Sequence, residues 1–331
     1  MENRPKSNLY GTWCNVTQEQ RTQLQTWLPL LVLAVLVLTV GIYDNAFFSA
    51  SNFLSVTADT MTLFLMASGV TLVIMMGGID LSVQAVASMA SCILAAYLQR
   101  LGFMAIPLAV LGGALAGFTG GLASTKFRIP SFIATLAVSG VVISAGNWFS
   151  QTRSVNIPGN LSATYLDWAI GEAFGVPNEI WVGVAFLILL SAVLGLTSFG
   201  RLVRGIGAQE RAVIASGINV DRIKIATYTL SGTMAGVAGV VMAARLGSGS
   251  PTLANEFLLP AIACIVVGGT AITGGVGSIW RTFVGALIVQ VVRIGMTFMG
   301  ISVFTQQIVF GFILVAAVAV TMDRAKVLVI K

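Results

Sequence analysis

The chain has 331 residues, of which 56% are hydrophobic and 9% are charged, and its formal net charge is +6. Soluble globular domains carry about 25% charged residues, so this composition excludes an ordinary soluble domain and indicates a polytopic membrane protein. The sequence has no histidine, and its three cysteines show no C-x-x-C spacing, which removes the usual general base and the commonest metal ligands. We therefore expect no catalytic residue, no metal and no cofactor in this chain.

Residues 1–26 are polar and of mixed charge, and a long apolar run without a small-residue cleavage signature follows them. This order predicts a retained first helix rather than a removed signal peptide. We expect three parts, namely a cytoplasmic segment over 1–26, a transmembrane domain over 27–322 and a cytoplasmic tail over 323–331.

Ten apolar segments are long enough to cross a bilayer, whose hydrocarbon core needs about 20 residues of helix. Backbone polar groups in lipid must be hydrogen-bonded within the protein, so the predicted fold is all-α with about ten transmembrane helices. Two segments depart from a plain apolar span: 81–98 is short and contains Gln84, and 257–273 contains Pro260. In chain order the segments are 27–43, 57–77, 81–98, 103–123, 130–149, 180–198, 225–244, 257–273, 280–298 and 303–322.

The positions of lysine and arginine support this topology, because cytoplasmic loops retain positive charge. With ten spans and a cytoplasmic N-terminus, fourteen of the eighteen basic residues lie inside and Arg293 falls within a span. The three that lie outside are Arg100, Arg153 and Arg245. Both termini are therefore predicted to face the cytoplasm. The same rule accounts for the net charge, so we expect no nucleic-acid partner.

The longest outer connection covers residues 150–179 and holds Arg153 together with three acidic residues. Trp168 and Trp181 stand at positions that suit a belt at the membrane interface. Two interpretations remain open from the residues. The connection either receives a delivered substrate or is a short surface helix that links two spans.

Glycine is frequent, with 36 residues, and it clusters within the spans. Gly113 and Gly117 in one span and Gly232 and Gly236 in another have the small-xxx-small spacing that lets two helices approach closely. We predict that these glycines pack helices within one bundle rather than forming a dimer face.

Two other glycine sites interrupt apolar runs where a continuous helix would be expected, and they resemble each other. They predict broken helices near 77–82 and 268–275. Paired breaks in the two halves of a transporter indicate a pathway formed by discontinuous helices, although chance similarity is the alternative. If the breaks form a pathway, we assign to it the polar residues Asp80, Ser82, Thr270 and Thr273.

Asp80, beside the first break, and Arg293, within a span, lie at membrane depth, where an ionisable group is costly and indicates function. Asp80 precedes Leu81 at the start of a new helix, so a second interpretation is an N-cap, which we favour and which is compatible with a place beside a pathway. Arg293 is predicted to face the interior of the bundle, with Gln290 nearby on the same helix.

The stretch 200–224 is a basic, glycine-punctuated connection between two apolar segments. Leu202, Ile206 and Val213 recur near helical spacing on one side and arginines recur on another, which predicts a short amphipathic helix interrupted at Gly207. Such a helix either lies along the membrane surface or docks a soluble partner.

Four motifs stand in order along the chain: GGIDLSV at 77–83, RIPSFIATL at 128–136, SGINV at 216–220, and GGT followed by GGVGS between 268 and 278. Together they resemble the permease subunits of bacterial ABC sugar importers. This is the ribose, xylose, galactoside and autoinducer-2 group, which is related to the branched-chain amino acid permeases. The resemblance covers about residues 50–320.

The resemblance implies a multi-pass protein of the bacterial inner membrane that forms a channel with a second permease copy or paralogue. A periplasmic sugar-binding protein would deliver the solute. A cytoplasmic ABC ATPase subunit would bind ATP, and this chain contains no G-x-x-x-x-G-K-[ST] motif of its own. The resemblance also implies a coupling helix in 200–224 that enters a groove on the ATPase through Gly207, Ala208, Gln209, Glu210 and Arg211. The chain departs from the family pattern at Gln84, Ala208 and Gln209.

The predicted function is the permease subunit of an ATP-driven importer of a sugar or related polyol, since no buried charge ladder is available to neutralise an ion. The alternative is an ion-coupled secondary transporter of a small polar solute. That transporter would need intramembrane carboxylates, for which Asp59 and Asp80 are the candidates. An integral membrane enzyme would need a nucleophile–base or metal-ligand cluster, which the sequence lacks.

Overall fold

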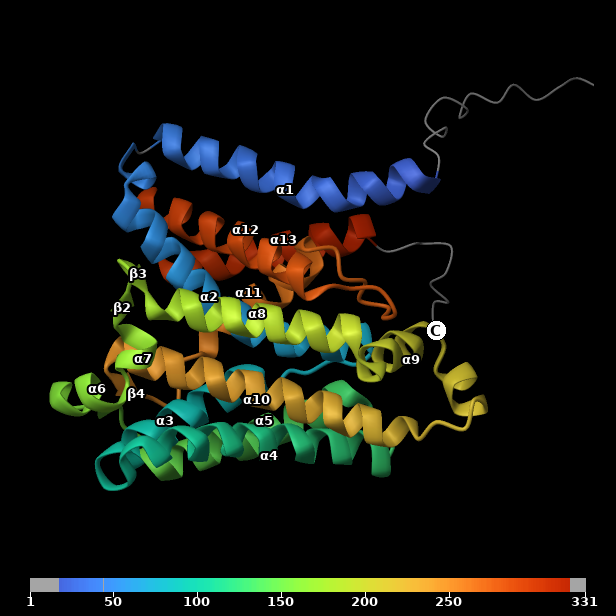
Figure 1. Cartoon of the computed structure of the whole chain (residues 1–331), viewed down its shortest axis with the longest axis horizontal. Helices are drawn as coiled ribbons and strands as arrows, with labels where there is room; N and C mark the ends of the chain where they lie inside the picture. Colours follow the sequence, from blue (N-terminus) through green and yellow to red (C-terminus); the bar gives the residue numbers. More distant parts are fainter. Residues whose placement is uncertain (1–17, 44, 322–331) are drawn as a thin grey trace, which may run out of the picture.

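The computed structural model describes residues 18–43 and 45–321, and this part of the chain is all-α (Figure 1). The predicted tail 323–331 and most of the predicted segment 1–26 lie outside the described residues. Each predicted apolar segment overlaps one helix. These helices are α1 (Gln18–Tyr43), α2 (Ala50–Met75), α3 (Val83–Leu101), α4 (Ala105–Lys126), α5 (Ser131–Ser150), α8 (Asn178–Leu196), α10 (Val220–Leu246), α11 (Leu258–Val267), α12 (Ile279–Phe298) and α13 (Val303–Thr321).

Six helical stretches in the described residues are long and apolar enough to cross a membrane. One of them is the continuous run Val83–Lys126, which joins α3 and α4 through the short helix η2 (Gly102–Met104). Three shorter apolar stretches, Pro29–Tyr43, Asn255–Val267 and Val303–Ala316, lie in the regions of α1, α11 and α13. The fold is thus an all-α protein with several membrane-spanning helices, and the count of ten stays a prediction.

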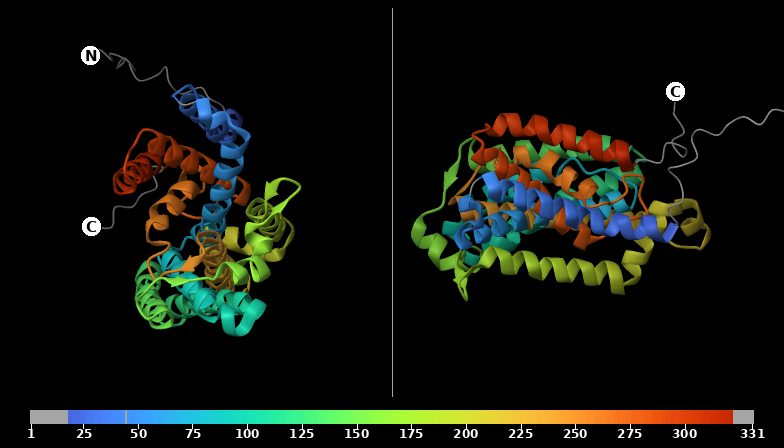
Figure 2. Two further views of the ribbon diagram at one scale, coloured as in Figure 1. Left: turned by 90° about the vertical axis from the view of Figure 1, so that its left-hand side faces the viewer. Right: turned by 90° about the horizontal axis from the view of Figure 1, so that it is seen from above.

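Helix α2 lies at the centre of the bundle, and every residue from Met61 to Met76 is buried. It packs against α8, α10, α11 and α12 (Figure 1, Figure 2). Its sequence is apolar around the whole helix, as expected of a helix surrounded by others. Helices α4 and α5, by contrast, expose large apolar side chains such as Leu115 and Val141, which suits a surface that faces lipid.

The two ends of the bundle differ in their connections (Figure 1). Helix α9 (Ser198–Ala215) lies at one end, together with the start of α1 and the described end of α13. The opposite end carries two short helices and two antiparallel strand pairs, so the connection 150–179 is more than a single surface helix. The connection contains α6 (Gly159–Tyr165), α7 (Asp167–Ile170), β1 (Val155–Asn156), β2 (Glu172–Ala173) and β3 (Val176–Pro177). Strand β1 pairs with β4 (Ser248–Gly249), which follows α10, and β2 pairs with β3.

The glycine pairs predicted from spacing pack α4 against α10. A Cβ atom placed on Gly113 would lie 3.0 Å from the Cα of Gly236, and one placed on Gly117 or Gly232 would collide with the backbone of the facing helix. Only residues without a side chain allow this approach of two helix backbones. The prediction that these glycines pack helices within one bundle is confirmed.

Candidate functional site

The two predicted breaks end their helices with the same hydrogen-bond geometry. At the end of α2, the Gly77 N–H donates to the Ile74 carbonyl and the Gly78 N–H to the Val73 carbonyl. At the end of α11, the Gly269 N–H donates to Val266 and the Thr270 N–H to Ile265. This is the Schellman pattern, in which the residue after the helix takes a left-handed conformation that favours glycine. Accordingly, Gly77 has a φ of 85° and Gly269 a φ of 84°.

The two breaks meet each other and meet α9 at a junction formed by backbone atoms. The Gly275 N–H, in the second break, donates to the carbonyl of Met75 at the end of α2, at 2.8 Å. Gly207 of α9 lies against both groups, and a Cβ atom added there would collide with the Met75 carbonyl and the Gly275 nitrogen. We call this contact the glycine junction. It joins three parts of the chain, namely the end of α2, α9 and the second break, and the contacting residues are each more than 60 residues from the next in the sequence.

Helix α9 is interrupted, but at a different residue from the one predicted. The non-helical residue is Gln209, with φ −160° and ψ 86°, rather than Gly207. Because that extended conformation is open to any residue, the kink does not need a glycine. A glycine is needed at position 207 for a different reason, because only a residue without a Cβ atom fits this close to Met75 and Gly275.

The residues predicted to couple to an ATPase differ in how free they are. Ala208, Gln209 and Arg211 are exposed at the end of the bundle. Glu210 is held by an ion pair with Lys224 of α10, at 2.7 Å. The kink at Gln209 therefore presents three exposed residues beside one that is tied back to the bundle.

Asp80 is buried, with 1% of its surface exposed, and both carboxylate oxygens accept hydrogen bonds. Its Oδ1 accepts from the backbone N–H and the hydroxyl of Ser82, and its Oδ2 accepts from the hydroxyl of Ser231 on α10, at 2.8 Å. The prediction that Asp80 caps a helix at Leu81 is wrong in register, because α3 begins at Val83 and Ser82 holds the N-cap position. The Leu81 N–H donates instead to the hydroxyl of Thr135 on α5, at 3.1 Å, so its partner lies outside the helix.

The four predicted pathway residues form two separate groups. Ser82 bonds to Asp80, whereas Thr270 and Thr273 lie in the second break. Thr270 is buried and its hydroxyl has no hydrogen-bond partner within the described part of the chain, and Thr273 is exposed. No hydrogen bond between described residues joins the Asp80 group to either threonine.

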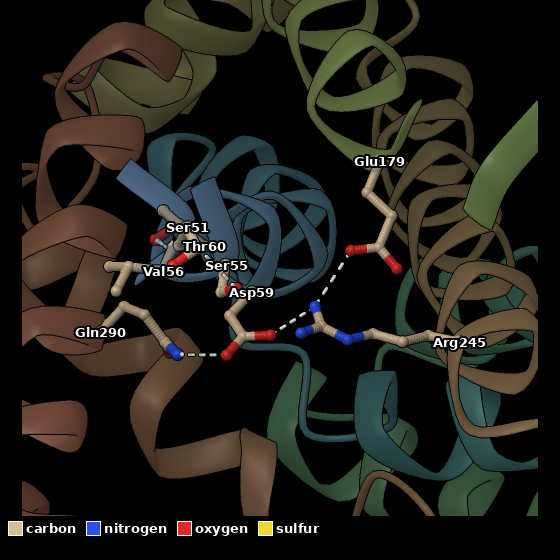
Figure 3. A network of polar contacts seen from close by, with 8 residues as sticks. All are labelled: Ser51, Ser55, Val56, Asp59, Thr60, Glu179, Arg245 and Gln290. Atoms are coloured by element: carbon tan, nitrogen blue, oxygen red, sulfur yellow. Dashed lines mark hydrogen bonds and ion pairs between the residues drawn. The ribbon is translucent and has the colours of Figure 1, made fainter. Parts of the chain in front are cut away.

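A charged network at the opposite end of the bundle was not predicted (Figure 3). Arg245, in the last turn of α10, forms ion pairs with Asp59 of α2 and with Glu179 of α8, the latter at 2.9 Å. Asp59 also accepts a hydrogen bond from Nε2 of Gln290, at 3.2 Å. The sequence placed Arg245 at this end and singled out Asp59 as a membrane carboxylate. What it could not supply was which helices are neighbours.

Beside this network lies a cavity of about 850 Å³ between α2, α10, α12 and the segment 252–257. Arg293 lines it and stacks on the ring of Phe257, 5.0 Å from the ring centroid. The prediction that Arg293 faces the interior near Gln290 is confirmed, because both residues line this cavity. A second polar cavity, of about 690 Å³, lies at the same end between the end of α3 and the connection after α5, and Arg100 and Arg153 line it.

Comparison with protein families matches residues 52–318 to the branched-chain amino acid transport system / permease component. The ribose import permease protein RbsC of Escherichia coli (strain K12) is 35% identical over 295 residues, which cover 88% of this chain and 92% of that protein. RbsC of Bacillus subtilis (strain 168) is 35% identical over 303 residues, or 90% and 92%. The fructose import permease protein FrcC of Rhizobium meliloti is 32% identical over 302 residues, or 88% and 84%. No solved structure matches the chain.

These matches cover most of the chain, and the family match over residues 52–318 includes the four motifs and both helix breaks. The resemblance drawn from those motifs is confirmed. The chain therefore belongs to the family of branched-chain amino acid transport system / permease components, and it is a permease subunit of an ABC importer rather than an enzyme.

Proposed function

We propose that this subunit carries a sugar or related polyol across the bacterial inner membrane, driven by ATP that a partner subunit hydrolyses. The solute class is inferred from the relatives, which are named as import permeases for ribose and fructose. The observation that carries the mechanism is the contact of α9 with both helix breaks at Gly207. Through the glycine junction, a push on α9 reaches the two places where the membrane helices are discontinuous.

In this proposal ten helices cross the membrane and both termini lie in the cytoplasm, on the side of α9. The distribution of charge supports this orientation, because α9 carries Arg201, Arg204 and Arg211. The shorter apolar helices α1, α11 and α13 are included in that count; α1 and α11 pack against α12, and α13 packs against α11.

The ATPase docks on the kinked part of α9, from Gly207 to Arg211. The exposed Ala208, Gln209 and Arg211 are available to the partner, and the Glu210–Lys224 ion pair ties the docked segment to α10. A displacement of α9 is thereby passed to α10 by side chains and to the breaks by backbone contact. Alternating access requires a coupling of this kind between the partner and the membrane helices.

The solute passes the two breaks on its way inward. Because the Asp80 carboxylate already bonds Ser82 and Ser231, Asp80 and Ser82 hold the wall of the pathway, whereas Thr270 and Thr273 have hydroxyls to offer the solute. A periplasmic sugar-binding protein docks on the connection 150–179 at the opposite end. A second permease copy or paralogue completes the channel.

Uptake into proteoliposomes tests this function. Vesicles that hold the permease with its ATPase, with the binding protein outside and ATP inside, should accumulate radiolabelled ribose or fructose. Uptake should stop when a non-hydrolysable analogue replaces ATP and should continue in the presence of an uncoupler. Uptake that depends on an ion gradient but not on ATP would favour the secondary-transporter alternative, and uphill uptake by this chain alone would refute the proposal.

A further inference from the structure

The cavity at the end opposite α9 is separate from the helix breaks. About 20 Å of α2 lies between Thr62, which lines the cavity, and Met75, where the helix ends. The cavity volume of about 850 Å³ falls within the range of about 300–1,000 Å³ that is usual for small-molecule sites. Its mouth carries exposed residues such as Ser55 and Asn255, and its deepest residues, Thr62 and Gln290, are buried.

The buried part of the cavity holds polar atoms without a protein partner. Gln290 is 3% exposed, and its Nε2 donates to Asp59 while its Oε1 has no hydrogen-bond partner among the described residues. The hydroxyl of Thr62, which is 5% exposed, likewise has no partner there. A buried polar atom left without a partner is costly, so these two groups are suited to hydrogen bonds with a bound molecule.

The charges around the cavity balance. Asp59 and Glu256 carry negative charge, Arg245 and Arg293 carry positive charge, and all four line the cavity. Amides and hydroxyls make up much of the remaining polar lining, and Phe257 and Phe298 contribute apolar surface. A lining of this kind has no net charge to attract an ion, but it offers both donors and acceptors. It suits an uncharged molecule with many hydroxyl groups.

We propose that this cavity is the site where the permease first receives its solute, and that Gln290 and Thr62 bind solute hydroxyls there. Asp59 and Arg245 supply a further acceptor and donor at the same wall, and the two phenylalanines pack against the CH groups of a sugar. This inference rests on the proposed function and adds to it a binding site that is distinct from the breaks.

The first test compares two variants of nearly unchanged volume with a matched control. In the complete importer, Gln290→Leu and Thr62→Val should each lower the ribose or fructose taken up per ATP hydrolysed about three- to tenfold, since each removes a hydrogen bond to the solute. Thr60→Val removes a buried hydroxyl from the same helix, but Thr60 donates to the Val56 carbonyl and does not line the cavity. It should keep the wild-type ratio.

The ratio of uptake to ATP hydrolysis separates binding from folding. A variant that merely misfolds loses uptake and stimulated ATP hydrolysis together. Wild-type ratios in both cavity variants, or a proportional loss of both activities, would overturn the assignment of the cavity. A wild-type importer that takes up neither sugar, although all three components are present, would instead refute the proposed function.

A second test needs no solute. In intact cells, a membrane-impermeant maleimide should label Ser55→Cys at the mouth of the cavity, whereas Ser216→Cys, exposed beside α9, should react only after permeabilisation. The native Cys92 and Cys264 are buried, and the unmodified chain gives the background. Failure to label Ser55→Cys in both intact and permeabilised cells would exclude an open cavity. Labelling of Ser216→Cys alone in intact cells would invert the proposed orientation.

Discussion

The two ends of the bundle are built from different kinds of contact. At the end of α9, the glycine junction brings together backbone atoms of Met75, Gly207 and Gly275 with no side chain between them. At the opposite end, charged and amide side chains surround a cavity of about 850 Å³. Backbone atoms in contact have no side-chain torsion that could absorb a movement, so the junction is suited to transmit a displacement. Side chains can exchange partners, so the cavity is suited to recognise a solute.

The largest effect is expected at the glycine junction. Gly207→Ala would push a methyl group into the Met75 carbonyl and the Gly275 nitrogen, and overpacking of this kind costs about 1–3 kcal/mol. We expect uptake by the complete importer to fall at least about tenfold, because α9 is displaced from both breaks. Gly195→Ala is the control, since a Cβ atom there meets nothing within 4 Å. Equal uptake by the two variants would mean that the junction does not transmit motion.

At the opposite end, Arg245→Leu should destabilise the protein without touching the junction. It leaves the carboxylates of Asp59 and Glu179 without their cation, and the Glu179 side chain is 5% exposed. Breaking a buried pair costs about 3–5 kcal/mol, and the partial exposure of Arg245 and Asp59 reduces this to about 2–3 kcal/mol. Thermal unfolding in detergent should show a lower Tm. Adding Glu179→Leu should restore part of the loss, and a double variant less stable than Arg245→Leu would argue against the pairing.

A smaller effect is expected where Asp80 holds the first break. Asp80→Asn keeps the shape but removes the charge that strengthens the bonds from Ser82 and Ser231, at a cost of about 1–2 kcal/mol. The same change at Asp221 should cost no more than about 1 kcal/mol, because its ion pair with Lys126 spans 3.4 Å and both side chains are about half exposed. The two variants can be compared by thermal unfolding. Equal shifts would show that the carboxylate does not fix the break.

The sequence was sufficient for features that depend on neighbours along the chain. Apolar length predicted the positions of the helices, and Gly77 and the glycines at 268–269 predicted where two of them end. Even so, the residue with the left-handed conformation is the first glycine of the pair at 77–78 but the second glycine of the pair at 268–269. That offset is decided by which carbonyls the terminal N–H groups reach.

Features that depend on neighbours in space could not be predicted. Nothing local indicates that Arg245 meets Asp59, or that the Leu81 N–H donates to the hydroxyl of Thr135. The interruption of α9 was predicted at Gly207 but lies at Gln209, because a glycine is the stronger local signal for a break. The pairing of distant groups is set by helix packing, which a single sequence does not reveal.

Helix α10 ties the two ends together. Near its start, Lys224 binds Glu210 of α9, in its middle Ser231 binds Asp80 beside the first break, and in its last turn Arg245 binds Asp59 and Glu179. An α-helix of 27 residues is a stiff rod about 40 Å long. If the rod turns or slides at its inner tip, all three attachments are strained at once. A movement that the ATPase imposes at the α9 end would then reach the cavity at the opposite end directly through α10.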